Sequence, residues 1–294
     1  NSKVMELLAW NWGQVQAFVR TWFGTEPEKA KHFLDKLRKD VQLRRLSRVP
    51  LMLMFLCRSC PEGEFPLRRC DLYERCLYGL FREWHRDEKE YVSKYSEVEL
   101  SRIYIGGLVE VLEHMCLELQ RKKQQQFTEL DIDAIARPFL NSIRSNDPSH
   151  VFNKLQTVSV DVVKRIIDDG VLIQGTNDGD AALSFIHVTM QEYLAARALA
   201  RRHDYIEEAL RHVYEPMWGQ VLIMLGALLE EPGPYIAAIF RKNREDMLCR
   251  PLVLAARITA EVERRQLPAA FRDGLASAVV SLLRREAGHL TEIA

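Results

Sequence analysis

The residues with the clearest capacity for chemistry lie where a predicted hairpin meets a predicted helix. The segment 184–199 reads SFIHVTMQEYLAARAL, and its short strand delivers His187 just ahead of a helix that we expect Thr189 and Glu192 to cap. An imidazole beside the free N–H groups and the positive end of a helix dipole can contact an anion. The alternative is that His187 merely ends the hairpin and hydrogen-bonds a neighbour. The residues taken alone favour that alternative, because lone histidines near strand ends are common.

Motifs of a self-sufficient enzyme are absent from the sequence. None of the 14 glycines begins a G-x-x-x-x-G-K-S/T loop, and G-x-S-x-G, H-E-x-x-H and G-x-G-x-x-G do not occur. His85 and His114 lie on separate predicted helices without an evident second ligand. Because neither a Walker A nor a Walker B motif is present, we expect no catalytic residues and no enzymatic activity in this chain.

The cysteines predict reduced thiols rather than disulfides or a metal site. Most of the six lie in apolar helical patterns, at positions 57, 60, 70, 76, 116 and 249. Cys57 and Cys60 form a C-x-x-C, but no second pair follows at the spacing of a zinc ribbon. We therefore expect no metal ligands.

Composition and charge restrict the class of protein. The 294 residues are 47% hydrophobic, enough for roughly two or three compact units. Lys plus Arg and Asp plus Glu both number 41, so no overall charge attracts nucleic acid or a membrane. Apolar runs such as 49–57 are shorter than a membrane span, and no signal peptide is evident, which predicts a cytoplasmic protein. The first residue is Asn1 rather than Met, and residues 4–10 already show an amphipathic pattern, so we expect the chain to be part of a longer one.

Helical periodicity dominates and divides the chain into three stretches. In the first, 1–62, a capping box of Thr25 and Glu28 is expected to start the second helix. The fourth helix begins with Pro50, which loses no needed hydrogen bond in a first turn. Since that helix is apolar nearly all round, it must be buried on several sides. The expected helices of this domain are 14–23, 25–39, 41–47 and 50–60.

The second stretch, 63–187, changes from helical to β periodicity near its end. Short β-type runs at 171–175 and 182–186 follow Gly170 and flank a turn-rich loop, which is typical of a hairpin. A helix closed by glycine and followed by a two-stranded wing is the order of a winged helix. The expected helices are 69–89, 96–121, where Ser96 and Glu99 form a cap, 128–140 and 159–169.

The third stretch, 188–294, is helical again. Antiparallel helix pairs of this length suggest HEAT-like stacking, although no strict sequence period is visible. The predicted fold class is mainly α: a helical domain, a winged-helix domain with a short β-hairpin, and an α-helical HEAT-like array. The expected helices of the array are 189–201, 205–212, 217–229, 234–242, 247–263 and 269–286.

Many winged helices bind DNA, and the charges of this one argue against it. The helix 159–169 sets Lys164 and Arg165 against three aspartates, and the wing tip adds Asp178 and Asp180. These surfaces would repel phosphates, so we expect no nucleic acid partner. Core burial rather than base stacking is expected of the tryptophans on apolar helix faces, Trp12, Trp22 and Trp218.

The segment 185–196, F-I-H-x-T-x-Q-E-Y-L-A-A, resembles a known family. It is similar to the segment that closes the winged-helix domain and opens the next helical domain in NACHT-type STAND NTPases, which include the NOD-like receptors. Two other segments agree in order. Residues 46–57, LSRVPLMLMFLC, are similar to the proline-bearing helix of the first helical domain, and 67–84 resembles the start of the winged-helix domain. The resemblance covers about residues 1–230.

The resemblance implies nucleotide contacts that this chain would supply to another domain. In the family, the phosphate-binding loop and the magnesium-binding acidic residues lie in a NACHT domain N-terminal to the first helical domain. The chain would then meet ADP or ATP, and magnesium, mainly through that upstream domain. The resemblance implies that His187 contacts the terminal phosphate of ADP in the resting state and that Pro50 packs near the adenine. For Pro50, a plain helix-start proline is an equally supported alternative.

These observations lead to three functional hypotheses. The main one is a regulatory, ADP-sensing and autoinhibitory portion of a signal-transducing NACHT-type STAND ATPase of innate-immune or defence type. Its partners would be its own upstream NACHT domain, further copies of itself after nucleotide exchange, and effector and sensor domains that the sequence does not name. The alternatives are a helical-repeat scaffold without nucleotide dependence and, less favoured, a DNA-binding regulator.

Overall fold

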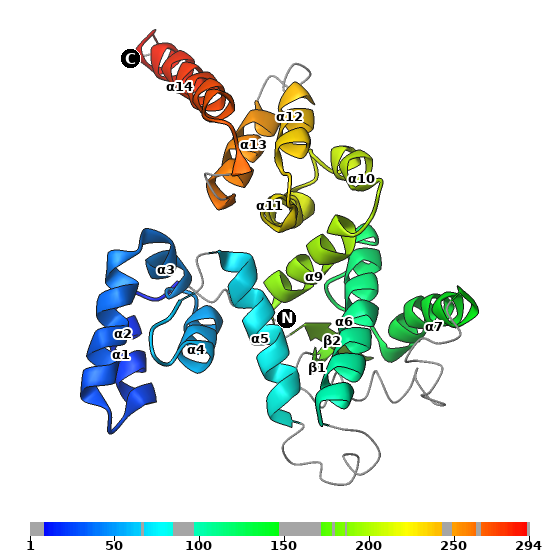
Figure 1. The fold of residues 1–294 in the computed structure, drawn as a ribbon. Helices are drawn as coiled ribbons and strands as arrows, with labels where there is room; N and C mark the ends of the chain where they lie inside the picture. Colours follow the sequence, from blue (N-terminus) through cyan, green and yellow to red (C-terminus); the bar gives the residue numbers. More distant parts are fainter. Residues whose placement is uncertain are drawn as a thin grey trace. The chain divides into compact units, whose positions relative to one another are not determined.

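A computed structural model describes residues 9–65, 68–84, 97–146, 172–177, 180–185, 187–242, 249–262 and 266–292. The chain divides into two compact units, Asn1–Gly79 and Leu80–Ala294 (Figure 1). Helices make up most of the described part, and one β-hairpin lies in the second unit. The predicted fold class, mainly α with a winged-helix hairpin, is confirmed. The domain boundaries at 62 and 187 and the HEAT-like repeat stay predictions.

The first unit is built from α1 (Trp12–Phe23), α2 (Pro27–Lys39), α3 (Val41–Leu46), α4 (Pro50–Ser59) and the start of α5 (Arg69–Trp84). Helix α1 lies against α2 and α4 (Figure 1). The core of this unit contains fully buried apolar side chains from α1, α2 and α4, namely Val15, Val19, Phe33, Leu37, Leu53 and Leu56. Burial of this set follows from their helical spacing, because residues three and four apart share one face.

Two helix starts in the first unit show what the sequence did and did not predict. Helix α4 begins at Pro50, with Val49 as its extended N-cap, and it buries side chains on several sides, as expected. The predicted capping box of Thr25 and Glu28 is wrong. Helix α2 begins at Pro27, and its N-cap residue makes no side-chain hydrogen bond. Because proline is pre-shaped for the first helical position, it moves the start past Thr25.

The hairpin of the second unit consists of β1 (Leu172–Asn177) and β2 (Asp180–Phe185), paired antiparallel (Figure 1). The strands are longer than predicted at the turn end and leave only residues 178 and 179 between them. Phe127 extends the pairing, since its N–H and carbonyl exchange hydrogen bonds of 3.0 and 2.7 Å with the backbone of Leu183. The predicted helix 159–169 and the predicted cap at Ser96 lie outside the described residues.

The winged-helix part of the second unit adds α6 (Glu97–Arg121), α7 (Glu129–Asn146) and α9 (Val188–Ala200). Helix α9 packs along α6 and also contacts β2 (Figure 1). Helix α7 begins one residue after Thr128, whose Oγ1 accepts the N–H of Asp131 at 3.2 Å. A polar side chain that satisfies a free N–H group explains why the helix starts there.

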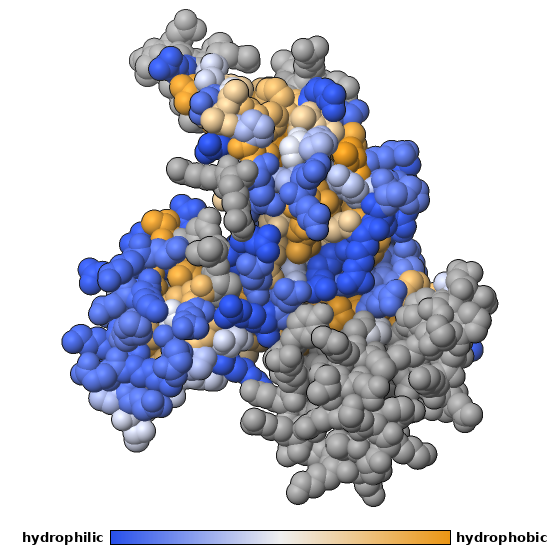
Figure 2. Space-filling view, in the orientation of Figure 1, coloured by the Kyte–Doolittle hydropathy of each residue, from blue (hydrophilic) through white to orange (hydrophobic). Residues whose placement is uncertain are grey.

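Successive helices continue the second unit. They are α10 (Tyr205–Arg211), the 3₁₀ turn Pro216–Trp218, α11 (Gly219–Leu228), α12 (Gly233–Arg241), α13 (Arg250–Glu261) and α14 (Ala269–Glu292). Helix α13 contacts α11, α12 and α14 (Figure 1). Hydrophobic residues gather on the visible face over α12 and α13, whereas the surface of α1–α3 is mostly hydrophilic (Figure 2). Val253 on α13 is 46% exposed.

The tryptophans and cysteines are placed as follows. Trp218 is fully buried, as predicted, but the prediction for Trp22 is wrong, because this side chain is 44% exposed and stacks on Phe18. Trp12 is half-buried. All six cysteines are buried and free, and burial raises the pKa of Cys57 and Cys76 to about 12. Along the described stretches of the chain, no helix has the length and apolarity needed to cross a membrane.

Candidate functional site

His187 is the N-cap residue of α9. Its backbone is extended, with φ −153° and ψ 139°, as is usual for an N-cap. The backbone N–H of Thr189 donates to Nδ1 of His187 at 3.2 Å, and Oγ1 of Thr189 lies 2.7 Å from the same nitrogen. The predicted capping box of Thr189 and Glu192 is therefore wrong. Since α9 already begins at Val188, the N–H of Thr189 is one of the free donors that the cap must satisfy.

The contacts of His187 define what its imidazole can offer. The ring is half-buried, and burial lowers its pKa from the ordinary value. The ring is therefore mainly neutral at pH 7. The alternative prediction for His187, a hydrogen bond to a neighbour, is observed in its contacts with Thr189. Within the described residues, Nε2 makes no hydrogen bond. Contact with an anion stays a prediction.

The remaining residues of the 185–196 segment hold α9 in place. The side chain of Gln191 is buried, and its Nε2 donates to the carbonyl of Gln124 at 2.9 Å, which fixes the first turns of α9 to the loop after α6. Leu194, Ala195 and Ala196 are fully buried. Most residues of the motif therefore serve to pack α9 against its neighbours. His187 is the residue of the motif that places an imidazole at the start of the helix.

A buried carboxylate fastens the second half of α9 to α6. Glu113 on α6 is 2% exposed and lies 2.8 Å from Nε of Arg197 and 2.8 Å from Nη1 of Arg201. Burial raises the pKa of Glu113, while the two guanidinium groups oppose that shift. Two cationic partners are the arrangement a carboxylate needs when it is taken out of water.

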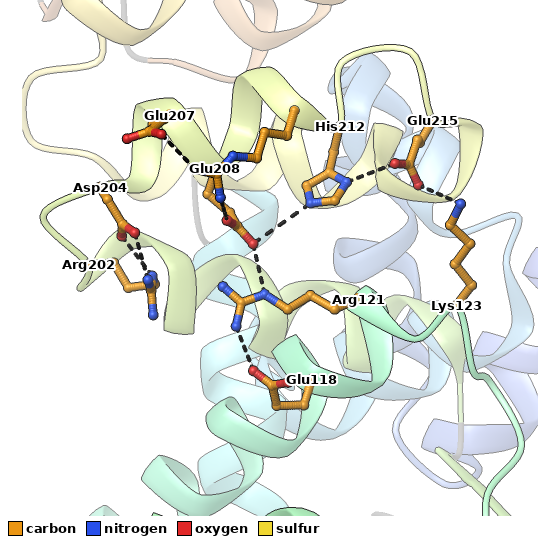
Figure 3. Close-up of polar contacts among 10 residues, drawn as sticks. Glu118, Arg121, Lys123, Arg202, Asp204, Glu207, Glu208, His212 and Glu215 are labelled. Atoms are coloured by element: carbon orange, nitrogen blue, oxygen red, sulfur yellow. Dashed lines mark hydrogen bonds and ion pairs between the residues drawn. The ribbon is translucent and has the colours of Figure 1, made fainter.

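A second buried carboxylate ties the C-terminal end of α6 to α10 (Figure 3). Glu208 accepts a hydrogen bond from Nε of Arg121 at 2.7 Å and lies 3.0 Å from Nη1 of Arg211. Arg121 also contacts Glu118 at 2.6 Å. Burial acts to raise the pKa of Glu208, but the hydrogen bond and charge of Arg121, with smaller contributions from His212 and Arg211, lower it. The carboxylate therefore stays ionised and links the two helices.

His212 continues this contact network beyond α10. Its Nδ1 lies 3.0 Å from Oε1 of Glu215 and its Nε2 lies 3.7 Å from Oε1 of Glu208, as Figure 3 shows. The ring stacks on Trp218, with centroids 3.8 Å apart and planes 1° from parallel. Oε2 of Glu215 in turn lies 3.1 Å from Nζ of Lys123, just after α6. The end of α6 is thus connected to α10 and to the segment before α11.

The predicted site residues belong to different units. Pro50 lies in the first unit, half-exposed at the first position of α4, and His187 lies in the second, so neither unit alone contains both. Sequence reasoning missed Glu113 and Glu208. The available indication for Glu113 was its place in the apolar pattern of 108–117, where Glu110 is the other acidic residue. Across the described residues, no three His, Cys, Asp or Glu side chains are grouped to hold a metal ion.

Comparison with known proteins assigns the central part of the chain. Residues 69–199 match the family model described as the winged helix-turn-helix domain C-terminal to NACHT. The match begins with α5, includes the β-hairpin and His187, and ends in α9. The comparison with curated proteins found no match to the chain.

Proposed function

Because residues 69–199 belong to the winged helix-turn-helix family found C-terminal to NACHT, we propose that this chain is the ADP-sensing, autoinhibitory portion of a signal-transducing NACHT-type STAND ATPase. The proposal includes an upstream NACHT domain that holds the nucleotide and magnesium, and a role in innate immunity or defence. One observation supports it: within the matched domain, His187 caps α9 through Nδ1, and its Nε2 has no hydrogen-bond partner among the described residues.

The chemistry of His187 suits a nucleotide held by another domain. A neutral imidazole with its proton on Nε2 donates a hydrogen bond to a phosphate oxygen without bringing a charge. The start of α9 adds the positive end of a helix dipole beside it. In the proposed resting state, Nε2 of His187 contacts the terminal phosphate of ADP, and Pro50 of the first unit packs near the adenine. In this proposal, exchange of ADP for ATP ends the contact between His187 and the terminal phosphate of ADP. Loss of that contact shifts the conformational equilibrium to an open, oligomerising state.

Two substitutions separate the capping role of His187 from the phosphate contact. His187→Asn keeps a side-chain oxygen that caps the helix, whereas His187→Ala removes both the cap and the imidazole. In the protein that carries the NACHT domain, we expect both variants to release ADP roughly 10- to 100-fold faster, since a hydrogen bond to a charged group contributes about 1.5–3 kcal/mol. Only His187→Ala should also lose about 1 kcal/mol of stability through the missing cap. ADP release from His187→Asn at the wild-type rate would refute the contact.

A helical scaffold without nucleotide dependence is the second candidate. The hydrophobic surface over α12 and α13 supports a partner-binding face (Figure 2). This candidate predicts that the NACHT-containing protein keeps one shape with ADP and with a non-hydrolysable ATP analogue, which small-angle scattering measures. A change in radius of gyration between the two nucleotides would exclude it.

A further inference from the structure

Thr189 contacts the imidazole of His187 through its backbone N–H and its side-chain hydroxyl. Its backbone N–H lies 3.2 Å from Nδ1, and its side-chain Oγ1 lies 2.7 Å from the same nitrogen. A backbone N–H can only donate, so Nδ1 must carry the lone pair. The hydroxyl, which can donate or accept, is then left to donate to that lone pair. The single proton of the neutral ring consequently lies on Nε2.

We infer that Thr189 is a positioning residue that holds His187 in the tautomer protonated on Nε2, with Nδ1 turned toward the first turn of α9. The inference rests on the proposed function, in which this Nε2–H donates to a phosphate oxygen of ADP. In the opposite tautomer Nε2 would present a lone pair to an anionic oxygen, and the contact would be repulsive. The backbone N–H of Thr189 keeps the lone pair on Nδ1, and the threonine hydroxyl adds a second donor to that lone pair, so the two groups together make the imidazole a donor toward the nucleotide.

The surroundings of the pair support a fixed arrangement. The hydrogen bond from Gln191 to the carbonyl of Gln124 holds the same helical turns, so the N–H of Thr189 keeps its direction. The pair is partly buried, which reduces competition from water. Burial also lowers the pKa of His187, and the neutral ring is the form for which the tautomer matters.

Substitutions at Thr189 test the tautomer directly. With ¹⁵N-labelled histidine, nuclear magnetic resonance separates a protonated, pyrrole-type ring nitrogen from an unprotonated, pyridine-type one. We expect pyridine-type Nδ1 and pyrrole-type Nε2 in the wild type and in Thr189→Ser, which keeps the hydroxyl. The side chain of Thr189→Asp offers only acceptors and competes with the backbone N–H for Nδ1, so the population protonated on Nδ1 should rise roughly tenfold or more, as expected for a charge-assisted hydrogen bond. His114, which stacks on Phe139, should keep its spectrum and serves as the internal control.

ADP release separates this inference from the proposed function. In the NACHT-containing protein, Thr189→Val keeps the side-chain shape without the hydroxyl and should release ADP about three- to tenfold faster, while Thr189→Ser should match the wild type. An unprotonated Nδ1 in Thr189→Asp, or wild-type ADP release from Thr189→Val when His187→Asn releases it fast, overturns the role of Thr189. Wild-type ADP release from His187→Asn together with the expected spectra refutes the proposed function and leaves the tautomer assignment standing.

Discussion

Gly226 lies where α11 packs against α13, and adding one methyl group there is expected to destabilise the second unit. A Cβ at this position would lie 2.2 Å from Cγ2 of Ile258 and 3.5 Å from Cε1 of Tyr235. Carbon atoms in good contact are about 3.5–4.0 Å apart, so the Ile258 contact must open by more than ~1 Å. Neither neighbour can retreat easily, because both are fully buried and the hydroxyl of Tyr235 donates to the carbonyl of Leu222 at 2.9 Å.

The expected cost of Gly226→Ala follows from two opposing contributions. Forcing a methyl group into a filled core costs about 1–3 kcal/mol. Replacing glycine by alanine inside a helix returns about 0.8–1 kcal/mol. We therefore expect a net loss of up to about 2 kcal/mol in the free energy of unfolding, measured by urea unfolding followed by circular dichroism. Gly274→Ala in α14 is the matched control, since nothing lies within 4 Å of its Cβ and only the gain of about 0.5–1 kcal/mol remains.

A double substitution identifies Ile258 as the source of the loss. Ile258→Ala removes the clashing methyl group and costs about 2–5 kcal/mol by itself. In that background Gly226→Ala should be neutral or stabilising, so the two changes should be strongly non-additive. If Gly226→Ala stabilised the wild-type protein as much as Gly274→Ala does, the close approach of α11 and α13 would be wrong.

Three further predictions concern charges and backbone conformation. Arg197→Met should cost about 3 kcal/mol in urea unfolding because it leaves Glu113 buried with a weaker set of partners, and adding Glu113→Met should restore part of the loss. Burial lowers the pKa of both His114 and His187, so the unfolded chain binds more protons than the folded one below about pH 6.5. The free energy of unfolding should therefore fall as the pH drops from about 6.5 toward the folded pKa values. His114→Gln should flatten this dependence in unfolding titrations between about pH 7 and 5. Lys123 has a left-handed φ of 58°, so Lys123→Gly should relieve up to about 1 kcal/mol of backbone strain. Because the variant also removes the ion pair of Lys123 with Glu215, it is compared in a Glu215→Gln background, where a lower unfolding midpoint would contradict the prediction.

Local patterns predicted most helices and the hairpin, because periodicity reports which face of an element is buried. Helix α4 begins at Pro50 and the hairpin lies at 172–185, both as expected from their residues. The caps were predicted less well. Thr189 is statistically a better N-cap than histidine, but His187 itself has the extended backbone of an N-cap, so the helix begins at Val188. The chain geometry before a helix therefore decides the cap more than residue preference does.

Burial of charged and aromatic side chains could not be predicted from the sequence, because it depends on partners that are distant along the chain. Glu208 is buried, and Arg121, 87 residues earlier, donates a hydrogen bond to it. Trp22 and Trp218 both lie in helices, yet one is 44% exposed and the other fully buried. For the candidate site, the resemblance pointed to His187. The hydrogen bonds that orient its ring could be identified only in the folded structure.

The restraints on α9 determine how a phosphate contact at His187 would be lost. The start of α9 is fixed by the Gln191 hydrogen bond, and its second half is fixed by the ion pairs of Glu113 with α9. The end of α6 is itself tied to α10 through Glu208. A local swing of His187 would break its own helix cap, so on the proposed function the contact should end by movement of the whole second unit relative to the nucleotide. His187 would then act as a fixed donor whose position reports the position of its unit.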